Sequence, residues 1–212
     1  MANKIGFYKR KSKIYFDKRA EDFLNTWDGR FCLLMYEEVM QRIRAQPFRS
    51  ILDIGCGTGA MLTQVLDEFT DIRACGVDLS QKMIEKAAGI LGPGVQLVVG
   101  DADDLPWKNN PFDLVVCNSS FHHFPEPIRV LNEINRVLKP GGRIIIADPW
   151  WSRPKRFFIN LFLNSPFNYL GDVRIYSEVE TREMLDRCRF SSISWELIDK
   201  RFFIAVALAK KG

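Results

Sequence analysis

Five short apolar runs, which alternate with segments of helical spacing, constrain the fold of this chain more than any other feature. The runs are rich in Val, Ile, Leu and Cys, so each predicts a strand buried on both faces of a parallel sheet. Strand–helix–strand repeats of this length imply right-handed crossovers and an open doubly wound α/β sheet. The predicted strands are Ser50–Ile54, Ile72–Val77, Val95–Val99, Phe112–Cys117 and Arg143–Ala147, and the predicted helices between them are Gly59–Phe69, Gln81–Ile90 and Glu126–Leu138.

The two ends of the chain add different elements. A helix at about Glu178–Cys188 is followed by two strand-like runs, Ile193–Ile198 and Phe202–Leu208, with three residues between them. So short a connection predicts an antiparallel hairpin, which is unusual at the end of a parallel sheet. Residues 1–48 have helical spacing, and we expect a helical lid segment there, followed by one binding domain over residues 49–212.

An aromatic-rich insert, about residues 149–176, separates the fifth predicted strand from the last helix. Its position at the carboxyl edge of the sheet predicts part of a lid over a bound ligand. The aromatic side chains favour an apolar or flat ligand, and packing within the lid or at a dimer contact explains them equally well. They are Trp150, Trp151, Phe157, Phe158, Phe162, Phe167, Tyr169 and Tyr176.

The composition limits the number of domains, the cellular compartment and the partners that we expect. With 212 residues, 47% of them apolar, the chain suits one globular domain, and no apolar run has the length of a membrane span. Five scattered cysteines without a Cys-x-x-Cys pair predict reduced thiols and a cytoplasmic protein. The net charge of +4 is too small to require a nucleic-acid partner.

Residues 4–19 and 153–156 are nevertheless basic, which predicts a mobile, solvated arm or a patch for an anionic substrate, RNA or a membrane surface.

A glycine-rich turn, Gly55-Cys56-Gly57-Thr58-Gly59, connects the first predicted strand to the first predicted helix. Such a turn uses residues without a Cβ where a ligand lies against the backbone. Its Gly-x-Gly-x-Gly spacing differs from the Gly-x-Gly-x-x-Gly of a pyrophosphate site, which argues against a nicotinamide-dependent oxidoreductase. Asp53 places a carboxylate where a cationic ligand group would bind. The amino-acid end of S-adenosylmethionine has such a group, and a dinucleotide has no cation to place there.

Polar side chains also follow the next three predicted strands, where Asp78, Asp101 and Asn118 stand at or just after a strand end. Asp78 can accept both ribose hydroxyls of a nucleoside, and Asp101 can accept from an adenine amine. A helix cap and an acidic first helical turn are the simpler explanations of these two residues. Because the carboxyl ends of parallel strands meet at one edge, we expect all three side chains to converge on one crevice.

Five sequence blocks, in fixed order, extend this pattern: Leu52-Asp-Ile-Gly-Cys-Gly-Thr-Gly59, Gly76-Val-Asp-Leu-Ser80, Gly100-Asp-Ala-Asp-Asp-Leu-Pro106, Phe112-Asp-Leu-Val115 and Arg136-Val-Leu-Lys-Pro-Gly-Gly142. Together they resemble the class I S-adenosylmethionine-dependent methyltransferases, especially the methyltransferase type 11 group that includes ubiquinone/menaquinone-biosynthesis enzymes. The resemblance covers about residues 50–148. It implies a Rossmann-like seven-stranded sheet of order 3-2-1-4-5-7-6, with the last strand antiparallel and helices on both faces. The predicted terminal hairpin agrees with this order.

The resemblance also implies a role for each motif residue. Asp53 and the glycine turn would hold the methionine portion of the cofactor, Asp78 the ribose, and Asp101 the adenine edge. A segment near the N-terminus folds over the cofactor in related enzymes, and Tyr15-Phe16-Asp17 is the candidate because an aromatic ring beside a sulfonium is favourable. The implied cofactor-binding residues are Asp53, Gly55, Cys56, Gly57, Gly59, Asp78, Leu79, Asp101, Ala102, Asn118 and Phe16.

His122 and His123 are the only histidines and the only candidates for a catalytic base. Methyl transfer needs a base only if the acceptor must lose a proton at or before attack, and much of the catalysis can come from positioning. We favour a structural role for His123 and leave the role of His122 open. No His or Cys spacing predicts a metal site.

The sequence therefore predicts an S-adenosylmethionine-dependent methyltransferase that produces S-adenosylhomocysteine. The expected acceptor is a small, apolar or aromatic molecule methylated on carbon, oxygen or nitrogen, and the expected protein is a cytoplasmic monomer or homodimer. The Asn118-Ser119-Ser120-Phe121 segment lacks the pattern of enzymes that methylate base amines, which makes a nucleic-acid partner less favoured. A methyltransferase acting on RNA or protein, and a non-catalytic cofactor-binding or RNA-associated protein, are the alternatives.

Overall fold

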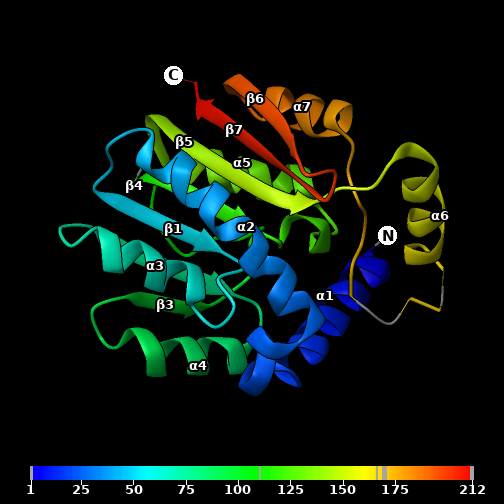
Figure 1. The fold of residues 1–212 in the computed structure, drawn as a ribbon, viewed down its shortest axis with the longest axis horizontal. Coiled ribbons are helices and arrows are strands. Elements are labelled where there is room, and N and C mark those ends of the chain that lie inside the picture. The colour runs from blue at the N-terminus through cyan, green and yellow to red at the C-terminus, as the bar shows by residue number, and fades with distance from the viewer. Residues whose placement is uncertain (1, 110, 166, 169–170, 211–212) are drawn as a thin grey trace.

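The computed structural model describes residues 2–109, 111–165, 167–168 and 171–210, so Tyr169 of the insert lies outside the described residues. One seven-stranded sheet of order β3-β2-β1-β4-β5-β7-β6 forms the centre of the molecule (Figure 1). Only β7 runs antiparallel, against both β5 and β6, and this confirms the predicted sheet order and terminal hairpin. The strands are β1 Ser50–Ile54, β2 Arg73–Asp78, β3 Gln96–Val99, β4 Phe112–Asn118, β5 Leu138–Pro149, β6 Phe190–Ile198 and β7 Phe202–Ala209.

Helices cover both faces of the sheet, which gives two separate apolar cores. Buried side chains of α2, α3 and α4 form the core on one face, and those of α5 and α7 form the core on the other. None of the described helices has the length and apolar character needed to cross a bilayer. The helices are α1 Ala2–Asp17, α2 Trp27–Arg44, α3 Ala60–Glu68, α4 Gln81–Leu91, α5 Pro127–Val137, α6 Arg153–Leu163 and α7 Glu178–Arg187, with 3-10 turns η1 Ala20–Asn25 and η2 Phe121–His123.

Local sequence signals set the ends of several helices. The Ser80 side chain accepts a hydrogen bond from the Met83 N–H at 3.1 Å and caps α4, as predicted. Ser177 and Glu180 form a reciprocal capping box at the start of α7. The predicted strand and helix boundaries agree with the observed ones within one to three residues, except that β5 begins at Leu138, directly after α5, and continues to Pro149.

Two segments differ from the sequence prediction. The basic N-terminus is not a mobile arm, because it folds as α1 and packs against the rest of the chain. The Tyr8 hydroxyl donates to the Leu163 carbonyl at 3.2 Å, which joins α1 to α6. The insert, for which no secondary structure was predicted, contains the eleven-residue helix α6. Both helices lie beside each other at the carboxyl edge of the sheet (Figure 1).

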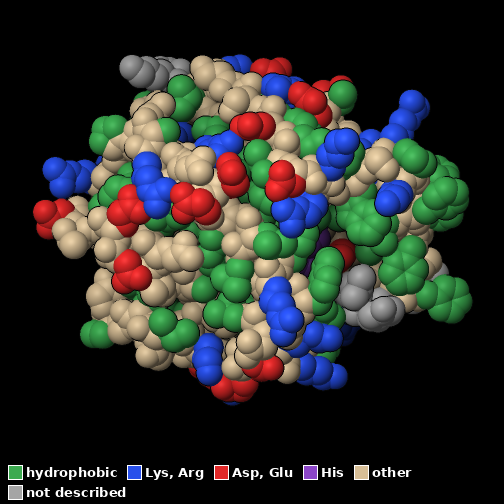
Figure 2. All heavy atoms as spheres, in the orientation of Figure 1, with side chains coloured by type: hydrophobic (Ala, Val, Ile, Leu, Met, Phe, Trp, Pro, Cys, Tyr) green, Lys and Arg blue, Asp and Glu red, His purple; other side chains and the backbone are tan. Residues whose placement is uncertain are grey.

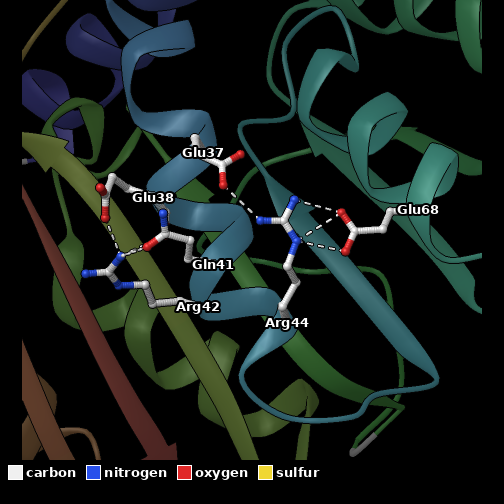
Figure 3. Close-up of polar contacts among 6 residues, drawn as sticks. All are labelled: Glu37, Glu38, Gln41, Arg42, Arg44 and Glu68. Carbon is white, nitrogen blue, oxygen red and sulfur yellow. Dashed lines mark hydrogen bonds and ion pairs between the residues drawn. The ribbon is translucent and has the colours of Figure 1, made fainter.

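Arginines join α2 to the sheet and to its neighbour α3. Arg44 at the end of α2 binds the Glu68 carboxylate of α3 and also Glu37 (Figure 3). These ion pairs are partly exposed, so each adds little stability. The buried Arg143 of β5 contributes more, because it donates to the carbonyls of Ile43 at 2.8 Å and Gln46 at 2.7 Å. These hydrogen bonds satisfy carbonyls at the end of α2 that have no helical partner.

Replacing Arg143 tests this attachment of α2. An Arg143→Met variant leaves two carbonyls without their charged donor, and we expect its free energy of unfolding to fall by about 2 to 4 kcal/mol. Urea denaturation measures this, with Arg30→Met, an exposed change on α2 itself, as the matched control. Equal stability of the Arg143 and Arg30 variants would show that the two hydrogen bonds are dispensable.

Candidate cofactor and acceptor sites

The glycine turn between β1 and α3 adopts a backbone that only glycine adopts easily. Gly55, Gly57 and Gly59 have φ values of 71°, 52° and 80°. A Cβ on Gly55 would lie 2.5 Å from the Ser120 Cβ, whereas a Cβ on Gly57 would meet nothing within 4 Å. The turn is therefore closed by packing on one side and is open at Gly57, where it borders a cavity.

The carboxylate of Asp78 holds this turn in place. One oxygen accepts from the Gly57 N–H at 2.9 Å, and the other accepts from the Ser80 N–H at 2.8 Å. The Val77 carbonyl accepts from the N–H groups of Gly55 and Cys56 at 2.8 and 3.1 Å. The end of β2 thus fixes both the turn after β1 and the start of α4.

A cavity, here called the cofactor cavity, lies at the carboxyl ends of β1, β2, β3 and β4. Ten of the eleven predicted cofactor-binding residues line it, and the exception is Gly59. A Cβ on Gly59 would lie 2.7 Å from the Leu91 side chain, so this glycine permits α3 to pack against α4. The ten lining residues are Phe16, Asp53, Gly55, Cys56, Gly57, Asp78, Leu79, Asp101, Ala102 and Asn118.

The electrostatics of the cofactor cavity favour a cationic ligand group. Burial, together with the nearby charge of Asp78, raises the pKa of Asp53 to about 7. The Oδ1 atom of Asn118 is buried and has no hydrogen-bond partner among the described residues. A carboxylate without a counter-ion and an unpaired amide oxygen fit the ammonium group at the amino-acid end of S-adenosylmethionine.

Helix α1 closes the cofactor cavity through charged contacts that the sequence did not predict. The Lys9 ammonium binds the carboxylates of Asp101 at 2.7 Å and Asp103 at 2.5 Å. At the other end of α1, Asp17 accepts from the Ser80 hydroxyl at 2.6 Å. Lys9, Ser12, Tyr36 and Met61 line the cavity without having been predicted, and no local sequence motif singles them out.

A second cavity, here called the acceptor cavity, adjoins the first. The two cavities share five lining residues, so they meet at a common wall. The shared residues are Phe16, Phe23, Cys32, Ser119 and His123. Most of the remaining wall is aromatic or aliphatic and comes from α1, α2 and the insert, and its members include Tyr15, Trp27, Phe31, Trp151, Ile159 and Ile175.

The two histidines have opposite electrostatic environments. His122 Nδ1 lies 2.9 Å from a carboxylate oxygen of Asp148, which is fully buried. Burial alone would lower the pKa of His122, but the charge and hydrogen bond of Asp148 raise it to about 9. Burial and the neighbouring charge of His122 lower the pKa of His123 to about 3. At neutral pH His122 is therefore a cation and His123 is neutral.

The insert loop completes this cluster. The Asp172 carboxylate lies 3.3 Å from His123 Nδ1, and the His122 carbonyl accepts from the Val173 N–H at 2.8 Å. His122, His123 and Asp172 each offer a ligand atom within 4.8 Å of the others, a spacing that could hold a metal ion. The positive charge on His122 opposes a second cation at that place. That the protein binds no metal therefore stays a prediction from the sequence.

Comparisons with known proteins agree with this geometry. Residues 52–146 match the family described as a methyltransferase domain. The chain is 32% identical over 142 residues to a demethylmenaquinone methyltransferase of Listeria monocytogenes, covering 65% of this chain and 59% of that protein. It is 32% identical over 155 residues to a phthiotriol/phenolphthiotriol dimycocerosates methyltransferase of Mycobacterium leprae, covering 66% of this chain and 55% of that protein. The first curated relatives are matched over 35 to 59% of their length.

Among solved structures, the fold resembles a chain of the complex between the Haloferax volcanii Trm112 methyltransferase activator and a methyltransferase. The TM-score is 0.76 with 21% identity, over 92% of this chain and 98% of that chain. Taken together, the motifs, the sheet order and these matches confirm the predicted resemblance to the class I S-adenosylmethionine-dependent methyltransferases. Within that class, the matched family is the methyltransferase type 11 group that the sequence resembles.

The ion pair of His122 and Asp148 makes a testable contribution to stability. The pKa of His122 is about 9 in the folded protein and near 6.5 when unfolded, so the contribution is fully present below pH 6.5 and is lost as the pH rises through 9. We expect the free energy of unfolding of the wild type to fall between pH 7 and 9.5 in urea titrations.

The Asp148→Asn variant should be less stable than the wild type at pH 7 and should show a flatter pH dependence over that range. Asp199→Asn, an exposed change in the β6–β7 turn, is the control and should follow the wild type. Parallel curves for wild type and Asp148→Asn would contradict the assignment of a charged His122.

Proposed function

We propose that this protein transfers a methyl group from S-adenosylmethionine in the cofactor cavity to a small, apolar or aromatic acceptor in the acceptor cavity, on carbon, oxygen or nitrogen. S-adenosylhomocysteine is the second product. The observation that carries the proposal is the wall shared by the two cavities, formed by residues such as Phe16, Ser119 and His123. Two ligands that both reach these shared residues would have their reacting ends next to each other, which is what an in-line methyl transfer requires.

Each part of the cofactor cavity suits one part of the cofactor. Asp53 and the unpaired Asn118 oxygen would bind the ammonium group, and the open backbone at Gly57 would lie along the methionine portion. Asp78 would accept the ribose hydroxyls with lone pairs that the backbone N–H groups leave free. Leu79, Asp101 and Ala102 would contact the adenine. The bound cofactor supplies a methyl group that its sulfonium has already activated.

The acceptor side acts mainly by positioning and by excluding water. The Phe16 ring packs edge-on against the His123 ring, with 5.1 Å between the centroids, so the sulfonium would meet an aromatic wall. His122 is already protonated and cannot accept a proton. His123 lines both cavities and is neutral, and burial together with the charge of His122 lowers its pKa to about 3, so it is a weak base. We therefore propose His123 as a residue that orients the acceptor.

The lining of the acceptor cavity favours a small molecule over RNA or protein. Its wall is largely aromatic and aliphatic, and within the described residues it carries neither Lys nor Arg. A phosphate backbone would need such cations. The two curated relatives are named for methyl transfer to demethylmenaquinone and to phthiotriol dimycocerosates, which supports the same choice. Cytoplasmic location and a monomeric or dimeric state belong to this proposal, and the five buried, unpaired cysteines support a reducing compartment.

A labelled-methyl transfer assay over a metabolite extract tests the function, with Asp78→Ala as the diagnostic variant. Loss of the Asp78 carboxylate removes the ribose acceptor and two backbone hydrogen bonds, so we expect S-adenosylhomocysteine affinity to fall at least about tenfold and methyl incorporation to be lost. Asp71→Ala, an exposed aspartate at the start of the same βα unit, is the matched control and should behave as the wild type.

Two results would separate the proposal from its alternatives. Unchanged affinity of a folded Asp78→Ala variant, checked by circular dichroism, would refute the ribose assignment. Tight binding of S-adenosylhomocysteine by the wild type without methyl incorporation into any extract component would favour a non-catalytic binding protein instead.

A further inference from the structure

The outer face of α6 exposes a cluster of large apolar side chains, and such a cluster marks an interaction surface. Phe157, Phe158 and Leu161 are 65%, 68% and 63% exposed, and Phe167 just beyond the helix is 79% exposed. Figure 2 shows hydrophobic side chains gathered at the right edge of the molecule, where α6 lies in Figure 1. Contacts within the described chain leave this face uncovered.

The helix is held so that this face must point outward. On its inner side, the Asn160 side chain makes two hydrogen bonds to the backbone of Ile175, at 3.0 and 2.8 Å, and Leu163 is fully buried. Position 163 lies on the opposite side of the helix from positions 157, 158 and 161, and position 160 lies at the boundary between the two sides. The exposed ridge is therefore fixed by the fold and does not result from a loose segment.

The charged residues of α6 itself are all basic. Residues 149–171 contain three basic residues, Arg153, Lys155 and Arg156, and no acidic residue. The adjacent helix α1 contributes further exposed cations such as Lys4 and Arg10, and its acidic residue Asp17 lies at the far end, bonded to Ser80. An apolar helix face flanked by cations matches an anionic lipid surface, where aromatic side chains insert and cations meet the headgroups.

We propose that α6, together with the basic N-terminal half of α1, binds the surface of an anionic lipid bilayer. A second copy of the chain fits this face less well, because two such surfaces would bring like charges together. The same helix supplies Ile159 to the wall of the acceptor cavity, and Trp151 just before it also lines that wall. If the proposed function holds, an acceptor dissolved in the bilayer would reach the cavity beside α6 without crossing water.

Vesicle co-sedimentation of the full chain tests the membrane surface independently of any methyl transfer. We expect the protein to sediment with vesicles of phosphatidylcholine and phosphatidylglycerol, to stay in solution with pure phosphatidylcholine, and to be released by high salt. The Phe157→Ser/Phe158→Ser variant should bind at least about tenfold more weakly, because two rings lose their apolar environment. The Arg153→Glu/Lys155→Glu variant should lose a similar amount through charge.

Two single changes far from α6 serve as matched controls. Ile90→Ser removes an exposed apolar side chain of α4, and Lys108→Glu reverses an exposed charge near the start of β4. Both should bind vesicles as the wild type does. All variants alter exposed side chains, and their S-adenosylhomocysteine affinity should be unchanged, which separates failure at the membrane from failure of the proposed function.

Three results would overturn the inference. Equal sedimentation with neutral and anionic vesicles would remove the role of charge. Equal binding by the α6 variants and the wild type would place the contact elsewhere. The third result combines absent vesicle binding with another contact that the Phe157→Ser/Phe158→Ser change abolishes. If that contact is a concentration-dependent dimer in analytical ultracentrifugation, the face binds a protein. If it is salt-sensitive binding of polyuridylate, the face binds RNA.

Discussion

The architecture of the site depends on one carboxylate, that of Asp78, at the end of β2. Because its two oxygens accept from Gly57 and Ser80, it fixes the left-handed glycine turn after β1 and the start of α4 at the same time. The glycine turn forms the floor of the cofactor cavity, and Ser80 at the start of α4 binds Asp17 of α1. A substitution at this position therefore affects both ligand binding and local structure, and the two effects must be measured separately.

Charge pairing organises the closure of the site. The carboxylates that line the edge of a parallel sheet repel one another, and α1 supplies Lys9 to two of them, Asp101 and Asp103. On the acceptor side, buried Asp148 is compensated by protonated His122, which leaves His123 neutral between the two cavities. Asp53 remains without a cation among its described neighbours, and the ammonium group of the cofactor would supply one. The buried Asp148 on the acceptor side is thus paired with a cation, whereas Asp53 on the cofactor side leaves a place for one.

The central sheet could be predicted from sequence because its signals are local. Buried strands have continuous apolar runs, Ser80 caps the following helix, and the β6–β7 connection is too short for a crossover. The cofactor cavity followed from the same logic, since parallel strand ends must converge. Gly59 shows what spacing cannot predict. A glycine is needed there because α3 packs against Leu91 of α4, and the spacing of the motif does not distinguish this reason from contact with a ligand.

The contacts of the lid could not be predicted, because they join residues far apart in the chain. Lys9 and Asp101 are 92 positions apart, and nothing around Lys9 marks it as different from the other basic residues of α1. The same holds for His122 and Asp148, whose pairing decides which histidine is charged. The sequence of the insert shows its basic and aromatic residues. Which of them lie on the inner and which on the outer face of α6 could be determined only from the structure of the helix.

A crystal structure of the protein with S-adenosylhomocysteine tests the central claim, that the two cavities join and that donor and acceptor meet at the residues lining both. The account predicts the sulfur in van der Waals contact, roughly 4 Å, with Phe16, Asn118 or His123, and facing the acceptor cavity. A sulfur directed to solvent, or a cofactor bound outside the turn at Gly57, would contradict it.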